Sequence, residues 1–97
     1  MPTQMQKYRI TPRVRDELLS IGRYTKHVWG SAQRNQYLKN LENRFVWLAE
    51  SPYRGRSRPE IGEGYYSFPQ GQHVVFYKIH EEFIEIIGVP HKQMDDL

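Results

Sequence analysis

Hydrophobic residues recur three and four positions apart over two stretches in the first half of the chain. The first set comprises Val14, Leu18, Ile21, Thr25 and Val28. The second comprises Tyr37, Leu38, Leu41, Phe45, Leu48 and Ala49. This spacing places each set along one side of an α-helix. The break between them, Gly30-Ser31, is short, so the pattern predicts an antiparallel helical hairpin with Ser31 as the N-cap of its second helix.

Proline residues mark the ends of this hairpin. Thr11-Pro12 suits a helix start, and Ser51-Pro52 suits the end of the second helix, because proline restricts the residue before it and is tolerated in a first helical turn. The partly apolar segment Lys7 to Ile10 precedes the hairpin. We therefore expect a brief edge strand ahead of the first helix.

The last third of the chain, from Gly64 to Asp95, contains three apolar runs separated by two turns, at Pro69-Gln70-Gly71 and Glu81-Glu82. This pattern predicts an antiparallel meander of three strands. Two of the strands are apolar on both faces. The alternating sets are Val75, Tyr77, Ile79 against Val74, Phe76, and Phe83, Ile87, Val89 against Ile84, Ile86. Since a hairpin covers only one face, we expect apolar residues on the other face to be left for a partner.

The predicted order is β-α-α-β-β-β, an α+β fold in which the helical hairpin packs on a small antiparallel sheet. With 97 residues the chain is expected to form one domain over residues 1–97. It has no cysteine, so disulfides and thiolate metal sites are excluded. We see no signal peptide or membrane span and expect a cytoplasmic protein. The net charge of +3 is too small to indicate nucleic-acid binding by itself.

Arginines stand at every second position of the loop after the helices, at Arg54, Arg56 and Arg58. An extended loop would present all three on one side, either as a solvated surface or as a contact for carboxylates or phosphates.

Aromatic residues offer further contacts. Tyr37 and Phe45 lie on the helical stripe and are expected in the core. Trp47 falls off the stripe, which favours an exposed anchor for a partner, and Tyr65 and Tyr66 divide between the two faces of the first meander strand.

The histidines give little support for catalysis. His73 and His80 are seven residues apart on one strand, which places them on opposite faces and about 23 Å apart. They cannot share a site or ligate one metal. His91 follows the last strand and has no second acid or base near it in the sequence. It is interpreted either as an exposed or capping histidine of a tail or as a functional contact.

Several segments together resemble the ParE toxins of the bacterial RelE/ParE superfamily of toxin-antitoxin modules. They are the G-R-x-R-P-E loop from Gly55, the S-F-P-x-G turn from Ser67, the V-x-F-Y strand and the closing H-x-x-M-D from His91. Two positions depart from the family pattern, because Tyr66 stands where arginine is frequent and Pro90 where leucine is usual. The resemblance implies the same β-α-α-β-β-β fold.

The resemblance also implies a function. ParE toxins act on DNA gyrase, trap cleaved DNA and block replication, and a cognate antitoxin neutralises them through a partly disordered segment. Higher-order complexes of toxin and antitoxin are expected, and no cofactor, metal or membrane is. The residues that we expect to bind the target or the antitoxin are Trp47, Arg54, Arg56, Arg58, Tyr65, Tyr66, His91, Lys92, Gln93 and Met94. On this interpretation the toxin acts by binding, without catalysis of its own.

Two alternatives stay open at this point. The superfamily also contains ribosome-dependent mRNA endonucleases of the RelE type, for which His91 would supply the acid or base and Arg54, Arg56 and Arg58 the positive charge. In the second alternative, the chain is a degenerate module that retains only the ability to form a complex with its antitoxin. Members of one fold need not share one activity.

Overall fold

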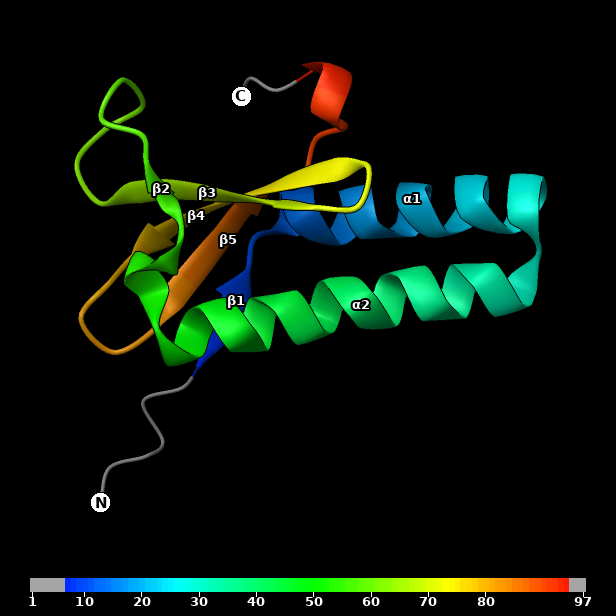
Figure 1. The fold of residues 1–97 in the computed structure, drawn as a ribbon, viewed down its shortest axis with the longest axis horizontal. Helices are drawn as coiled ribbons and strands as arrows, with labels where there is room; N and C mark the ends of the chain where they lie inside the picture. Colours follow the sequence, from blue (N-terminus) through cyan, green and yellow to red (C-terminus); the bar gives the residue numbers. More distant parts are fainter. Residues whose placement is uncertain (1–6, 95–97) are drawn as a thin grey trace.

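The computed structural model describes residues 7–94. Two long helices run side by side and a five-stranded sheet lies across one end of them (Figure 1). The elements in chain order are β1 (Tyr8–Ile10), α1 (Pro12–Trp29), α2 (Ser31–Glu50), the 3-10 helix η2 (Pro52–Arg54), β2 (Arg56–Ser57), β3 (Tyr65–Gln70), β4 (His73–Ile79), β5 (Ile84–Gly88) and the 3-10 helix η3 (Lys92–Met94). The predicted α+β order is confirmed.

The ends of α1 follow the sequence closely. The hydroxyl of Thr11 accepts a 3.1 Å hydrogen bond from the backbone N–H of Val14, and Pro12 is the first helical residue. Gly30 separates the helices with a φ of 95°, which favours glycine. Gly30 therefore takes the cap position of α2. The prediction that Ser31 caps this helix is wrong, since Ser31 lies inside it.

The two helical stripes form the helical half of the core. Val14, Ile21 and Thr25 of α1 and Leu41, Phe45 and Leu48 of α2 are buried. The first stripe fails at its end, because Val28 remains 45% exposed. Figure 1 shows the reason: the hairpin extends well past the sheet, so its tip has no third layer to pack against.

The sheet has the strand order β1-β5-β4-β3-β2. Three of its pairs are antiparallel, whereas β1 joins β5 in parallel, with Tyr8 opposite Ile84 and Ile10 opposite Ile86. The turn between β3 and β4 lies two residues later than predicted. Pro69 still belongs to β3. The strand β2 pairs with β3 only at Tyr66 and Ser67, so the sheet does not need a backbone N–H from Pro69 on that side.

The face of the sheet away from the helices is covered more fully than the sequence suggests. Phe76 is 1% exposed and Val74 is 8% exposed. The guanidinium of Arg58 lies over the Phe76 ring, with its carbon 4.9 Å from the ring centre. The expectation that this face leaves these residues to water is therefore wrong, because the loop after α2 folds back over them.

A bulge changes the alternation in the last strand. Phe76 pairs with Gly88 and Tyr77 pairs with Ile86, so Ile87 has no partner in the ladder. Val89 consequently joins Ile84 and Ile86 in the core beneath the helices. The strict alternation of the sequence had placed Val89 with Phe83 and Ile87 instead.

Candidate functional site

Two arginines lie against the indole of Trp47 near the end of α2. The guanidinium carbons of Arg44 and Arg54 are 4.4 Å and 4.2 Å from the ring centre, within the range of cation–π attraction. Arg54 also donates a 2.9 Å hydrogen bond to the carbonyl of Trp47, and the Phe68 ring lies 5.1 Å away. Trp47 is therefore half-buried between charged groups. The prediction of a simply exposed indole is wrong.

The three loop arginines do not share one side. Arg54 belongs to η2 and turns toward Trp47 on the helix side of the sheet, whereas Arg58 covers Phe76 on the opposite side. Arg58 also donates to Ser67 Oγ at 3.0 Å and pairs with Glu60 at 2.6 Å. Arg56, in β2, is exposed. The loop is not extended throughout, and this separates the charges that the alternating pattern had grouped together.

Tyr65 and Tyr66 point to opposite faces of β3, as the sequence predicts. Tyr66 stacks on Tyr77 and meets the edge of Tyr53, with ring centres 5.9 Å and 5.6 Å away. Lys78 Nζ lies 5.2 Å from the centre of the Tyr65 ring. Tyr53, Tyr65, Tyr66 and Lys78 line an open cleft of about 650 Å³ beside the end of β4. Tyr53 projects from its rim and is 72% exposed.

The hydroxyl of Tyr77 ties this region to the loop. It donates a 2.6 Å hydrogen bond to the carbonyl of Pro52 and accepts a 3.1 Å bond from the backbone N–H of Gly55. Burial raises the pKa of Tyr77 to about 12. The phenol is therefore neutral near pH 7 and joins β4 to the backbone of the loop at Pro52 and Gly55.

His73 and His91 come together although they are far apart in sequence. They form an antiparallel bridge, and their ring centres are 5.4 Å apart in a T-shaped arrangement. Nδ1 of His73 is 2.6 Å from the Tyr37 hydroxyl. Burial lowers the pKa of His73 and the nearby His91 lowers it further, while Glu17 acts in the opposite direction. The fold thus gives His91 the ionisable neighbour that its local sequence lacks, whereas His80 pairs elsewhere, with Glu85.

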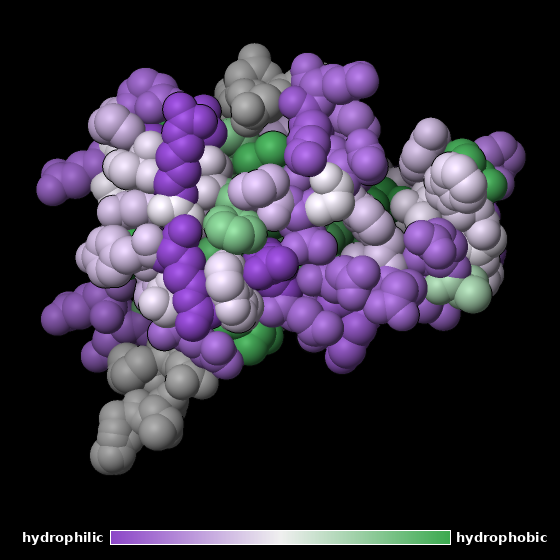
Figure 2. All heavy atoms as spheres, in the orientation of Figure 1, coloured by the Kyte–Doolittle hydropathy of each residue, from purple (hydrophilic) through white to green (hydrophobic). Residues whose placement is uncertain are grey.

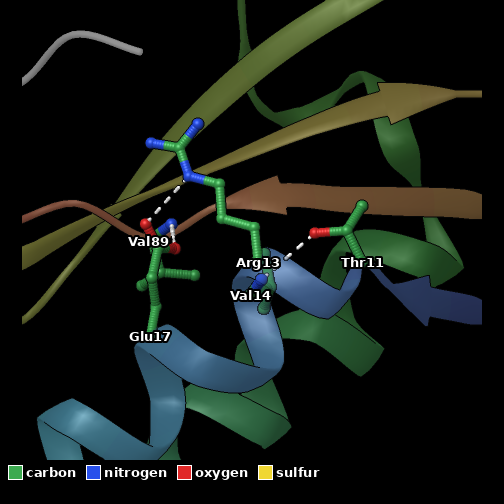
Figure 3. A network of polar contacts seen from close by, with 5 residues as sticks. All are labelled: Thr11, Arg13, Val14, Glu17 and Val89. Atoms are coloured by element: carbon green, nitrogen blue, oxygen red, sulfur yellow. Dashed lines mark hydrogen bonds and ion pairs between the residues drawn. The ribbon is translucent and has the colours of Figure 1, made fainter.

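A cleft of about 590 Å³ opens beside these rings, between α1 and the segment that follows β5. Arg13, Asp16, Glu17, Ser20 and Ile21 line it from α1. Figure 3 shows how its floor is built: Glu17 Oε1 accepts a 2.7 Å bond from the backbone N–H of Val89, and Oε2 accepts a 3.2 Å bond from Arg13 Nε. Nothing in the local pattern singles out Glu17, and the helical stripe indicated only a core role for Tyr37, not its contact with His73.

The tail after β5 is fastened to the β3–β4 turn. The carbonyl of Pro90 accepts from the N–H of Val74 at 2.9 Å, and the N–H of Lys92 donates to the carbonyl of Gln72 at 2.8 Å. Lys92 and Gln93 are exposed, and Met94 ends η3. The start of the tail that was predicted to bind a partner is therefore an ordered turn at the surface. Asp95, the last residue of its motif, lies outside the described residues.

The exposed side chains of α1 include those of Leu19, in the middle of the helix, and of Tyr24 and Trp29, toward the hairpin tip. Leu19 is 56% exposed, Tyr24 66% and Trp29 69%. Figure 2 shows mostly pale, near-neutral spheres with a few green ones at the right-hand end, beside the strongly polar middle of the molecule. These exposed side chains lie on the hairpin, whereas the sequence pattern had predicted exposed apolar residues on the sheet.

Metal and membrane sites are not apparent in the described part of the chain. Residues 7–94 contain no cluster of three or more histidine, aspartate or glutamate side chains that could hold a metal ion. Neither of the long helices in that range is apolar enough along its length to cross a bilayer.

The chain has the fold of a class of small α+β proteins in which a helical hairpin packs on a five-stranded sheet. A solved structure described as the chromosomal ParDE TA system from P. aeruginosa matches with a TM-score of 0.75, over 92% of this chain and 98% of that one. The sequences are only 13% identical, so this match shows the fold alone.

Sequence comparison identifies the family. The model of the ParE toxin of type II toxin-antitoxin systems, parDE, matches residues 8–96. Toxin ParE1 of Caulobacter vibrioides is 33% identical over 91 residues, covering 94% of both chains. Toxin ParE1 of Mycobacterium tuberculosis is 33% identical over 90 residues, covering 92% of both. The chain belongs to the ParE toxin family of type II toxin-antitoxin systems.

Proposed function

We propose that this toxin inhibits DNA gyrase by binding it while DNA is cleaved, so that breaks persist and replication stops. Membership of the ParE family over residues 8–96 is the observation that carries the proposal. On this proposal the toxin acts in the cytoplasm, where gyrase and chromosome meet, and performs no chemistry of its own.

The gyrase contact is assigned to the tail that begins at His91. Its backbone bonds to Gln72 and Val74 hold it in place, while Lys92 and Gln93 face solvent. A surface that is ordered before binding loses less conformational entropy when it meets its target. Met94, which follows them in η3, is included in this contact.

The antitoxin is proposed to cover apolar side chains that the isolated toxin exposes. A chain that folds on binding can wrap a large area, and Leu19, Tyr24 and Trp29 offer such an area on the hairpin. Acidic antitoxin residues would pair with the exposed Arg56 and with Arg54 beside Trp47. Tyr65 and Tyr66, in the cleft with Tyr53, add an aromatic contact.

The geometry gives little support to the ribonuclease alternative. That mechanism needs His91 and the loop arginines at one phosphate. His91 lies on the α1 side with His73, Arg58 is on the opposite face of the sheet, and Arg54 is stacked on Trp47. A single phosphate cannot meet all of them without rearrangement of the loop.

The test adds purified toxin to gyrase with supercoiled plasmid and, separately, to translating ribosomes with a reporter mRNA. Linear DNA covalently linked to gyrase is the expected result, with intact message. The double variant Lys92→Ala, Gln93→Ala should lose DNA linearisation, while the matched helix variant Lys26→Ala, Arg23→Ala should keep it. Cleaved message with unaffected plasmid would overturn the proposal in favour of the ribonuclease.

Antitoxin binding is tested separately, with the product of the neighbouring gene. We expect this protein to raise the melting temperature of the toxin and to suppress its effect on gyrase. Replacing Leu19 and Trp29 by serine should weaken the complex while leaving gyrase inhibition intact. An unchanged melting temperature on mixing would refute this part of the proposal.

A further inference from the structure

The cleft between α1 and the tail brings together three side chains that carry hydrogen-bond donors: Arg13, His73 and His91. We propose that this cleft is a binding site for a phosphate group, held by the guanidinium of Arg13 and the Nε2 atoms of the two histidines. The inference goes beyond gyrase inhibition and does not depend on it.

The hydrogen bonds made by the two imidazoles leave Nε2 for a ligand in both cases. His91 Nδ1 accepts a 3.2 Å bond from the backbone N–H of Gln93, which places the proton of the neutral ring on Nε2. His73 Nδ1 faces the Tyr37 hydroxyl, and Tyr37 does not line the cleft. Within residues 7–94, no side chain or backbone group pairs with either Nε2 atom.

Arg13 is held in place while most of its donors stay available. Its Nε bonds to Glu17 Oε2, and Figure 3 shows the rest of the guanidinium extending past that carboxylate. The side chain is 54% exposed, so the terminal nitrogens can reach a ligand in the open cleft. The two terminal nitrogens of the guanidinium, Nη1 and Nη2, would form the paired contact that arginine makes with phosphate oxygens.

The charges of the cleft make binding sensitive to pH. With both histidines neutral, Asp16 and Glu17 outweigh Arg13, and protonation of the two rings reverses the sign. Glu17 is already paired with Arg13 and with the N–H of Val89, whereas Asp16 is an exposed carboxylate that opposes an anion. Tyr37 remains neutral, since burial raises its pKa. A bound phosphate should therefore stabilise the histidinium forms and take up protons as it binds.

The donor pattern favours phosphate over a metal ion or a carboxylate. A metal on His91 Nε2 would need a deprotonated nitrogen there, yet Nδ1 is already the acceptor of a backbone N–H. A carboxylate offers two oxygens in one plane, whereas the donors here come from α1, from the start of β4 and from the tail. The oxygens of a tetrahedral phosphate can meet three such directions together.

The experiment follows the histidine ring signals by NMR while the whole toxin is titrated with three probes: inorganic phosphate, the dinucleotide TpT and acetate. TpT carries one phosphodiester, whose charge stays constant over the pH range used. We expect TpT to bind about tenfold more tightly near pH 5.5 than near pH 7.5, because burial lowers the pKa of His73 in the free protein and a bound anion favours its protonated form. Stronger binding of TpT would indicate a nucleic-acid backbone, and stronger binding of phosphate a free phosphate or monoester. Either result supports the site.

Variants distinguish the site from general attraction to a basic protein. Arg13→Gln should weaken binding by about tenfold, His73→Gln should flatten its pH dependence, and Asp16→Asn should tighten it. Arg23→Gln, an exposed arginine farther along α1, is the matched control and should change nothing. Circular dichroism checks that each variant is folded. The proposal is overturned if phosphate and TpT fail to bind near pH 5.5, if acetate binds as tightly, or if Arg13→Gln and Arg23→Gln behave alike.

Discussion

Glu17 on α1 accepts a 2.7 Å hydrogen bond from the backbone N–H of Val89, just past β5. The same carboxylate also holds Arg13, so one side chain joins the first helix to the end of the sheet. This bond fixes the start of the tail relative to α1. The cleft that holds His91 depends on it.

The first prediction concerns this link. Replacing Glu17 by alanine should lower the free energy of unfolding by about 1 to 3 kcal/mol, because the part-buried N–H of Val89 loses its acceptor. Asp16→Ala is the control, since Asp16 is exposed on the next position of the helix. Urea unfolding of both variants provides the measurement. Equal stability of the two would mean that the bond contributes nothing.

Tyr77→Phe should destabilise the protein by about 1 to 3 kcal/mol without opening a large cavity. The change removes only the hydroxyl, which leaves the carbonyl of Pro52 and the N–H of Gly55 without their partner. Tyr24→Phe offers a matched control, because Tyr24 is 66% exposed on α1. Thermal unfolding should separate the two variants clearly, and a Tyr77→Phe protein as stable as wild type would contradict this role.

Arg58→Ala should reduce stability by about 1 to 2 kcal/mol, more than the same change at Arg56. Arg58 packs its long side chain over Phe76 and donates to Ser67, whereas Arg56 is exposed two residues earlier. Chemical denaturation compares the pair. If both arginines served only as surface charges, their alanine variants would unfold at the same denaturant concentration.

Acid should destabilise the toxin through His73. Its pKa is lowered in the folded state from the ordinary value of 6.5, so the unfolded chain takes up the proton at a higher pH than the folded one. The stabilisation is present above pH 6.5 and is lost as the pH falls toward the folded-state value. His73→Gln should therefore show a smaller loss of unfolding free energy on acidification. An identical pH profile for variant and wild type would exclude His73 as the cause.

Local pattern was sufficient to predict the helices and most of the strands. The stripes that end at Thr25 and Ala49 are buried as their spacing indicates, because the helical period alone determines which side of each helix faces the sheet. Val28 fails for a reason that no helical pattern contains: the hairpin is longer than the sheet is wide. The predicted β3–β4 turn begins two residues too early. Pro69 suggested a turn, and only the structure shows that β2 ends before Pro69 and leaves room for proline within the strand.

The site depends on contacts between distant residues, and there the sequence says less. His73 and His91 meet only because the bulge and the bridge set the path of the chain after β5. Arg54 and Arg58 separate because η2 interrupts an otherwise extended loop. The family motifs identified the segments that matter, whereas which side chains face one another depended on the packing of α1 and α2.

The parallel pair between β1 and β5 has a consequence for how the toxin is made. Tyr8 reaches its partner only when Ile84 has been synthesised, so the sheet cannot close until residue 84 has left the ribosome. Contacts this far apart in sequence also slow folding, because a long loop must close before they form. A nascent chain in which residue 84 is not yet available therefore lacks the β1–β5 pair and cannot form the complete sheet.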